Sequence, residues 1–93
     1  MIISIVKEVV WTKLGDEVAI LNPTTGTYFG LDPVGSRIWC LIAEGLAEDE
    51  MISTLISEYE VDEQRLRSDL RELIDQLAGK SLVTLSNEKE PSR

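Results

Sequence analysis

The stretch from Tyr28 to Trp39 constrains the fold most, because it predicts a β-strand that runs directly into a capped α-helix. Aromatic and aliphatic side chains dominate its first part, Tyr28–Leu31, and such residues are typical of strands. Asp32 is a favourable N-cap, and Pro33 suits the first helical position, where a backbone N–H would have no intrahelical partner. The helix should end at Gly45, because glycine readily takes the left-handed conformation that closes many helices. The fold must therefore accommodate a strand and a helix joined without a loop.

Three strands are predicted in the first third of the chain. Ile2–Trp11 is rich in isoleucine and valine, Val18–Leu21 is almost entirely apolar, and Thr27–Leu31 leads into the helix. Turn residues in Leu14–Glu17 and Asn22–Gly26 separate these strands. Two short connections favour an antiparallel meander, and the apolar middle strand is expected to be central.

After the junction the apolar residues recur with helical spacing, which predicts two further helices. The second helix covers about Glu48–Glu58, and its cap position holds Ala47, where serine or aspartate would be favourable. The third covers about Asp62–Ala78, with the aspartate as its cap and Gly79 as its C′ residue. A short strand, Leu82–Leu85, follows the third helix.

The apolar positions of these elements predict a shared core. In the first helix the buried side chains are expected to be Val34, Ile38, Leu41 and Ile42, with Trp39 on the flank. The elements together predict an α+β fold, a winged helix-turn-helix with an N-terminal three-stranded antiparallel sheet packed on three helices. At 93 residues the chain is one domain, expected over residues 1–85, and the polar segment 86–93 is expected to be a disordered tail.

The formal net charge of −8 argues against nucleic acid as a partner, because such binding relies on lysine and arginine at the phosphates. The same charge disfavours anionic membrane surfaces. No apolar run reaches the roughly 18 residues of a membrane span, and the N-terminus lacks the basic region of a signal peptide. Cys40 is the only cysteine, so an internal disulfide cannot form. These features predict a cytoplasmic protein with no membrane or nucleic-acid partner.

The residue types needed for catalysis are largely missing. Without histidine, the Ser–His and Cys–His arrangements of nucleophilic catalysis are excluded. Cys40 alone cannot build a thiolate or imidazole metal site and is expected to pack as a small hydrophobic residue. Neither a GxGxxG nor a Walker A sequence is present. The chain is therefore expected to be no enzyme, to have no catalytic residues and to use no metal or cofactor.

Most of the chain, from about Val18 to Val83, resembles the family of coenzyme PQQ synthesis protein D, small domains also known as precursor-peptide recognition elements. The resemblance rests on the Tyr28–Trp39 stretch, on Ala43–Gly45, on Tyr59–Asp62 and on the leucines of the last helix. Within this family the short stand-alone form looks most like the recognition proteins of lasso peptide clusters. The resemblance implies a protein that binds the leader of a ribosomally made precursor peptide. It also implies that a separate leader peptidase, a transglutaminase-like cysteine protease, acts in trans, and that a cyclase then acts on the freed core.

An exposed strand beside an amphipathic helix is a site at which a peptide can add as a further strand. The sequence predicts such a site between the third strand, which can lie at the sheet margin, and the third helix. Backbone pairing would supply affinity, and the side-chain pockets would supply selectivity. The expected leader-binding residues are Thr27, Tyr28, Phe29, Gly30 and Leu31 on the strand, and Leu66, Asp69, Leu70 and Leu73 on the helix, with Asp69 at the rim.

Two other functions are compatible with the same residues. A PQQ-type chaperone would use the same fold and binding mode to deliver a precursor to a radical SAM enzyme. A plain interaction module would instead form a homodimer, paired through the Ile2–Val10 strand. Binding to a synthetic leader peptide separates recognition from self-association, and the neighbouring genes separate the two kinds of recognition protein.

Overall fold

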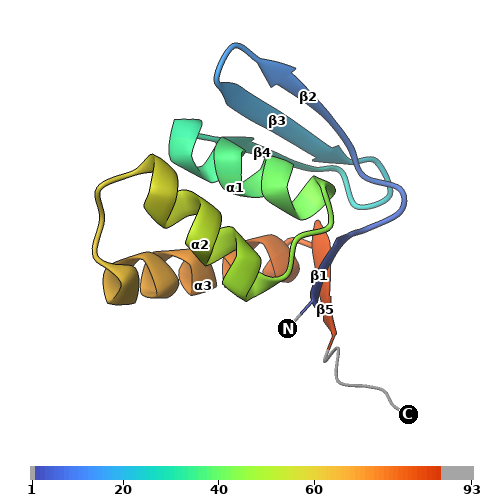
Figure 1. The fold of residues 1–93 in the computed structure, drawn as a ribbon. Coiled ribbons are helices and arrows are strands. Elements are labelled where there is room, and N and C mark those ends of the chain that lie inside the picture. Colours follow the sequence, from blue (N-terminus) through green and yellow to red (C-terminus); the bar gives the residue numbers. More distant parts are fainter. Residues whose placement is uncertain (1, 87–93) are drawn as a thin grey trace.

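Three helices pack against two separate antiparallel sheets in the computed structural model, which describes residues 2–86 (Figure 1). One sheet is the meander β2-β3-β4, and the other pairs β1 with β5. In chain order the elements are β1 (Ile2–Ile5), β2 (Val10–Leu14), β3 (Glu17–Asn22), β4 (Thr27–Leu31), α1 (Pro33–Ala43), α2 (Glu48–Glu58), α3 (Glu63–Gly79) and β5 (Val83–Ser86). The fold is therefore α+β, as predicted, and the winged helix-turn-helix arrangement stays a prediction.

The three-stranded sheet confirms the predicted meander and its central strand. Ile20 on β3 lies opposite Trp11 on β2 and opposite Phe29 on β4. Its side chain is fully buried, because it projects from the central strand toward the helices. β4 thus has one edge paired with β3, and no strand within residues 2–86 covers its other edge.

The prediction of one strand over Ile2–Trp11 is wrong. β1 stops after four residues and belongs to the second sheet, where Ile3 lies opposite Leu85. The chain then turns, and the Val9 N–H donates to the Val6 carbonyl at 3.0 Å. A polar Lys-Glu pair occupies this turn and interrupts the apolar run. The change from one sheet to the other could therefore not be predicted from the apolar composition of this segment.

Helix α1 begins and ends where the sequence predicts. The Asp32 carboxylate accepts a hydrogen bond from the Gly35 N–H at 2.8 Å, and Gly45 has a φ of +89°. α2 begins without a side-chain cap, because the alanine at Ala47 has no side-chain oxygen to accept a hydrogen bond. The Glu50 carboxylate accepts from the Ala47 N–H at 2.8 Å instead, so one half of a capping box is present.

The start of α3 is confirmed, but its predicted end is wrong. The Asp62 carboxylate accepts from the Arg65 N–H at 3.0 Å, as an N-cap does. Gly79 is the last helical residue rather than the C′ residue, and Ser81 takes the left-handed conformation with a φ of 63°. The buried Asn22 side-chain amide donates to the Ser81 carbonyl at 2.8 Å. A contact from β3, 59 residues away in sequence, therefore stabilises the turn after α3.

Two of the core predictions for helix α1 are wrong, those for Trp39 and Val34. Trp39 is fully buried rather than on the flank, because its ring meets the edge of the Trp11 ring at a centroid distance of 6.1 Å. The meander lies against this side of α1, opposite α2 and α3 (Figure 1). Val34 was expected in the core but is 44% exposed, because it lies in the first helical turn beyond the end of β4. The other predicted core residues of α1 are buried: Ile38, Leu41 and Ile42.

The predicted tail begins at Ser86, which closes β5, and its other residues, 87–93, lie outside the described part of the chain. Among the residues that are described, no helix combines the length and the apolar character needed to cross a bilayer.

Candidate functional site

Strand β4 presents an open edge with two different faces. Its side chains alternate, so that Phe29 and Leu31 point toward the helices while Tyr28, 69% exposed, points to the opposite face. A Cβ atom at Gly30 would meet no heavy atom within 4 Å, so the face of the strand that carries Tyr28 is open at that position. In an antiparallel pair alternate residues turn their backbone N–H and C=O groups away from the partner strand. The outer edge of β4 therefore offers unpaired backbone groups to a further strand.

A buried serine fixes the end of β4 to the start of α1. The Ser36 hydroxyl accepts a hydrogen bond from the Val18 N–H at 2.7 Å and donates one to the Leu31 carbonyl at 3.2 Å. Gly35 leaves room for the Asp32 cap, because a Cβ atom there would lie 3.1 Å from the Asp32 carboxylate. The junction that dominates the sequence thus sets the orientation of β4 relative to the helices.

A hollow of about 470 Å³ lies between β4 and α3. The strand and the first turn of α1 form one wall, and α3 forms the other. Its lining residues are Phe29, Gly30, Leu31, Asp32, Val34 and Gly35 on the first wall, and Asp69, Leu73 and Gln76 on the second. The hollow is therefore bounded by an open strand edge on one side and a mixed apolar and polar helix face on the other.

A second hollow, also of about 470 Å³, continues the first toward the start of α3. Val34 and Asp69 line both hollows, so the two form one groove along α3, which we call the β4–α3 groove. The remaining residues of the second hollow come from the α2–α3 connection and the first turns of α3: Glu60, Val61, Asp62, Arg65 and Leu66.

One stripe of α3 faces this groove. Asp69, Leu73, Gln76 and Lys80 recur at intervals of four and three residues, which places them on the same side of the helix. The Lys80 ammonium lies over the ring of Phe29, the middle residue of β4, 5.5 Å from its centroid. The helix axis therefore runs antiparallel to β4, with the Asp69 carboxylate where the two hollows meet and the Lys80 ammonium beyond Gln76, over the Phe29 ring.

The structure brings most of the predicted site residues together. Phe29, Gly30 and Leu31 on the strand and Asp69 and Leu73 on the helix line the first hollow, and Leu66 lines the second. Leu70 is fully buried and lines neither hollow, because it points into the core. Thr27 and Tyr28 lie on the same strand but outside both hollows, at its start and on its outer face.

Sequence reasoning missed eight of the residues that line the two hollows: Asp32, Val34, Gly35, Glu60, Val61, Asp62, Arg65 and Gln76. It also missed Lys80, which lies over the Phe29 ring but lines neither hollow. The helical spacing from Asp69 was visible in the sequence and could have revealed Gln76 and Lys80. The same spacing rule assigned Val34 to the core, because an apolar residue in a first helical turn can either pack in the core or line a groove.

Ion pairs join the three helices that position the groove. Arg37 on α1 donates to the Glu58 carboxylate at 2.9 and 2.6 Å, and these bonds hold the pKa of that carboxyl below its ordinary value. Arg71 on α3 donates to the Glu48 carboxylate of α2 at 3.1 and 3.3 Å. These contacts hold α2 against both of its neighbours and thereby support α3 in its position across from β4.

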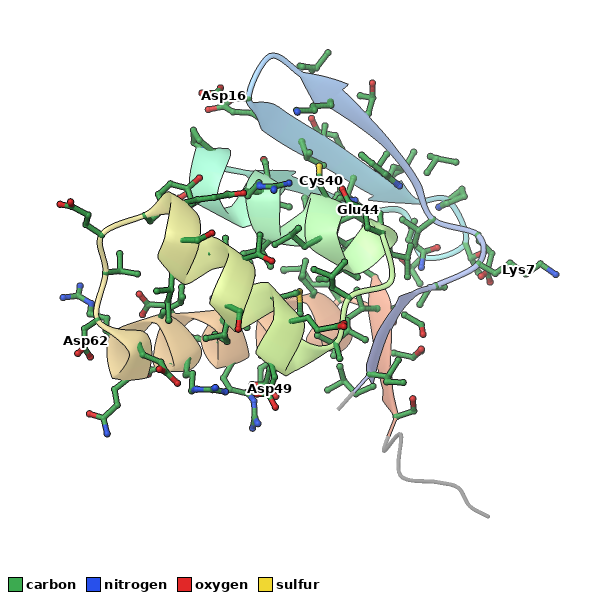
Figure 2. All side chains as sticks on the ribbon, in the orientation of Figure 1. Lys7, Asp16, Cys40, Glu44, Asp49 and Asp62 are labelled. Carbon is green, nitrogen blue, oxygen red and sulfur yellow. The ribbon has the colours of Figure 1, made fainter. Side chains whose placement is uncertain are left out.

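The lone cysteine lies away from the groove. Cys40 is half-buried on α1, and Figure 2 shows it with Glu44 on the side of the helix turned toward the β2–β3 hairpin. A hollow of about 360 Å³ lies beside it, and Lys13, Asp16 and Tyr59 are among its lining residues. Within residues 2–86, no group of three or more His, Cys, Asp or Glu side chains is arranged to hold a metal ion.

Comparison with solved structures gives two close matches. The structure of TbiB1 in complex with the TbiA(beta) leader peptide has 42% sequence identity and a TM-score of 0.86, over 91% of this chain and 99% of that one. The structure of lasso peptide synthetase B1 complexed with the leader peptide has 19% identity and a TM-score of 0.82, over 91% of this chain and 100% of that one, and shows a shared fold. No curated protein sequence matches the chain.

The profile of one protein family, described as coenzyme PQQ synthesis protein D (PqqD), matches residues 17–83. This range begins with β3 and ends at the first residue of β5, so it contains β4, all three helices and the whole β4–α3 groove. The chain belongs to the PqqD family.

Proposed function

We propose that this chain is a non-catalytic recognition protein that binds the leader of a ribosomally made precursor peptide of the lasso type in the β4–α3 groove. The leader adds as a strand to the open edge of β4 and packs its inward side chains against α3. The bound precursor is then delivered to a separate leader peptidase. The observation that carries this proposal is the open β4 edge facing α3 across the groove, in a chain 42% identical to a protein solved with a leader peptide.

The energetics of strand addition are adequate for such a complex. About four backbone hydrogen bonds contribute roughly 0.5–1.5 kcal/mol each, and two or three buried apolar side chains contribute about 1.5–3 kcal/mol each. Ordering a flexible leader costs about 2–5 kcal/mol or more, and association adds its own entropy cost. The balance is compatible with a dissociation constant that is micromolar or lower.

A binding measurement tests the recognition step. The TbiA(beta) leader, labelled with a fluorophore, is a suitable first probe because the protein that binds it is similar over nearly its whole length. Fluorescence polarisation should give saturable binding to this chain, and an unlabelled copy of the peptide should compete. Leaders encoded next to this chain's own gene provide the second probe. If neither class of leader binds at protein concentrations of hundreds of micromolar, the proposal is wrong.

A reconstitution tests the delivery step. Purified precursor, this protein and a leader peptidase of the transglutaminase-like class are mixed in all combinations, and cleavage is followed by mass spectrometry. The precursor should stay intact with this protein alone and should be cut fastest with both proteins, because tethering raises the effective concentration of the substrate. A peptidase that works equally fast alone would refute the delivery step. Cleavage by this chain alone, surviving further purification, would refute its non-catalytic role.

A further inference from the structure

The first hollow of the β4–α3 groove, the one between β4 and α3, has opposite charges at its two ends. Asp69 and Asp32 line the end near Leu31, and Lys80 lies over Phe29 toward the other end of the strand. The carboxylate of Asp69 is available to a ligand, because its contact with Arg65 is long, at 3.9 Å, and both side chains are largely exposed. No ion pair joins Lys80 to a carboxylate within residues 2–86.

The spacing of these charges can be compared with that of an extended peptide. Lys80 directly follows the last residue of α3 and still donates its N–H to the Gln76 carbonyl, so its Cα atom lies about 16 Å from that of Asp69, eleven residues earlier, at 1.5 Å per residue. A strand covers that distance in about five residues. The Lys80 head group lies over the ring of Phe29, within β4 and not beyond its end. Since only alternate side chains of a strand face one side, the fitting separation on the peptide is four residues.

The direction of the added strand follows from the sheet. β2, β3 and β4 are all antiparallel to their neighbours, and antiparallel pairing is slightly more stable per residue than parallel pairing. A peptide antiparallel to β4 begins at the Leu31 end, beside Asp69, and continues toward the Phe29 end, beside Lys80. Leu73 lies between the two charges on the groove-facing stripe of α3.

We propose that the β4–α3 groove selects leaders that carry a basic residue, an apolar residue two positions later and an acidic residue four positions after the basic one. Asp69 recognises the basic side chain, Leu73 packs against the apolar one, and Lys80 recognises the acidic one. Asp69 and Lys80 are thus specificity-determining residues, and their order fixes the polarity of the bound peptide. This inference rests on the proposed function, because it assumes that a leader strand occupies the groove.

A peptide selection tests the inference without knowledge of the natural client. A display library of random linear 12-residue peptides is selected against four forms of the chain: wild type, D69K, K80E and the double variant D69K/K80E. Wild type should enrich the basic–x–apolar–x–acidic order. D69K should change the first preference to acidic, K80E should change the last to basic, and the double variant should enrich the fully reversed order.

Two charge-matched controls accompany the selection. D75K changes an exposed aspartate on another face of α3, and K13E changes an exposed lysine on β2, at the opposite edge of the sheet. Both should keep the wild-type preference. Circular dichroism checks that every variant retains its helices, which is expected because all four side chains are exposed.

A direct affinity measurement then gives the size of the effect. With a labelled wild-type peptide as probe, D69K and K80E should each weaken binding about three- to tenfold at low salt, and the loss should shrink as salt rises. If wild type, D69K and K80E all enrich the same peptides, and these show no order of charges, the inference is wrong and the proposed function stands. Enrichment of the acidic–x–apolar–x–basic order by wild type would overturn the stated polarity. If no peptide is enriched and leader binding also fails, both the inference and the proposed function are wrong.

Discussion

At the scale of single residues, two buried polar side chains form hydrogen bonds between segments that are far apart in the sequence. The Ser36 hydroxyl joins the Val18 N–H of β3 to the Leu31 carbonyl of β4. The Asn22 amide joins β3 to the turn at Ser81. Both side chains are 2% exposed, so their hydrogen bonds replace contacts with water that the fold has removed.

The substitution S36A tests this role. It leaves the buried Val18 N–H without its acceptor, and this should lower the free energy of unfolding by about 1–3 kcal/mol. Urea denaturation followed by circular dichroism measures the change. S53A is the matched control, because Ser53 is exposed on α2 and the same substitution there should stay within about 0.5 kcal/mol. Equal stability of S36A and S53A would contradict the structural role of Ser36.

At the scale of elements, β4 and α3 contribute to the groove in different ways. β4 offers backbone groups along its open edge, whereas α3 offers side chains from one stripe. Ion pairs join α1 to α2 and α3 to α2, and they help to position α3. Under the proposed function, the strand would supply affinity for any extended peptide, and the helix would supply the preference among peptides.

The strand contribution can be tested at Gly30. Proline removes a backbone donor, so G30P should abolish leader binding while α1, α2 and α3 stay folded. G30A is the control, because its Cβ atom would meet nothing within 4 Å and its N–H is retained. Fluorescence polarisation with a leader probe should show that G30A binds like wild type. Wild-type affinity in a folded G30P protein would exclude β4 as the docking edge.

The helix contribution can be tested with two leucines that are three residues apart. L70A removes a fully buried side chain and should lower the free energy of unfolding by about 2–5 kcal/mol. L73A removes a half-buried side chain that lines the groove, so it should cost less stability and weaken leader binding. Parallel urea titrations and polarisation assays compare the two. A larger binding loss for a folded L70A protein would mean that the groove is assigned to the wrong face of α3.

At the scale of the whole molecule, a single apolar core joins both sheets and all three helices. Ile3 on β1 belongs to the same buried cluster as Ile20 on β3 and Trp39 on α1. The pairing of β1 with β5 also closes the chain, because it joins residues from the two ends of the described segment. One continuous core at this size is expected to unfold in one cooperative step.

Cooperativity between the two sheets is testable with tryptophan fluorescence. Trp11 and Trp39 report on the meander and α1, whereas I3A is a change in the other sheet. I3A should lower the free energy of unfolding by about 2–5 kcal/mol and shift the fluorescence and circular dichroism transitions together. I2A is the control, because Ile2 is 38% exposed and its substitution should have a small effect. A fluorescence midpoint unchanged by I3A would show that the sheets unfold separately.

The sequence by itself determined the features that depend on neighbouring residues. The Asp32 and Asp62 caps, the Gly45 terminus and the strand-to-helix junction follow from residue types at fixed short spacings, and the structure has them where they were predicted. Part of the groove was also predictable: six of the named residues line its two hollows, because strand and helix periodicities identify which residues share a face.

Tertiary structure decided what depends on contacts between distant segments. Ile2–Trp11 divides between two sheets because β5 pairs with its first part, and Ser81 ends α3 because Asn22 binds its carbonyl. Trp39 is buried because Trp11 lies against it, and Leu70 lies in the core while Leu73 lines the groove. Periodicity shows only that such residues are apolar on one helix face. Which side of that face meets the core and which meets the groove is fixed when the other elements pack against it.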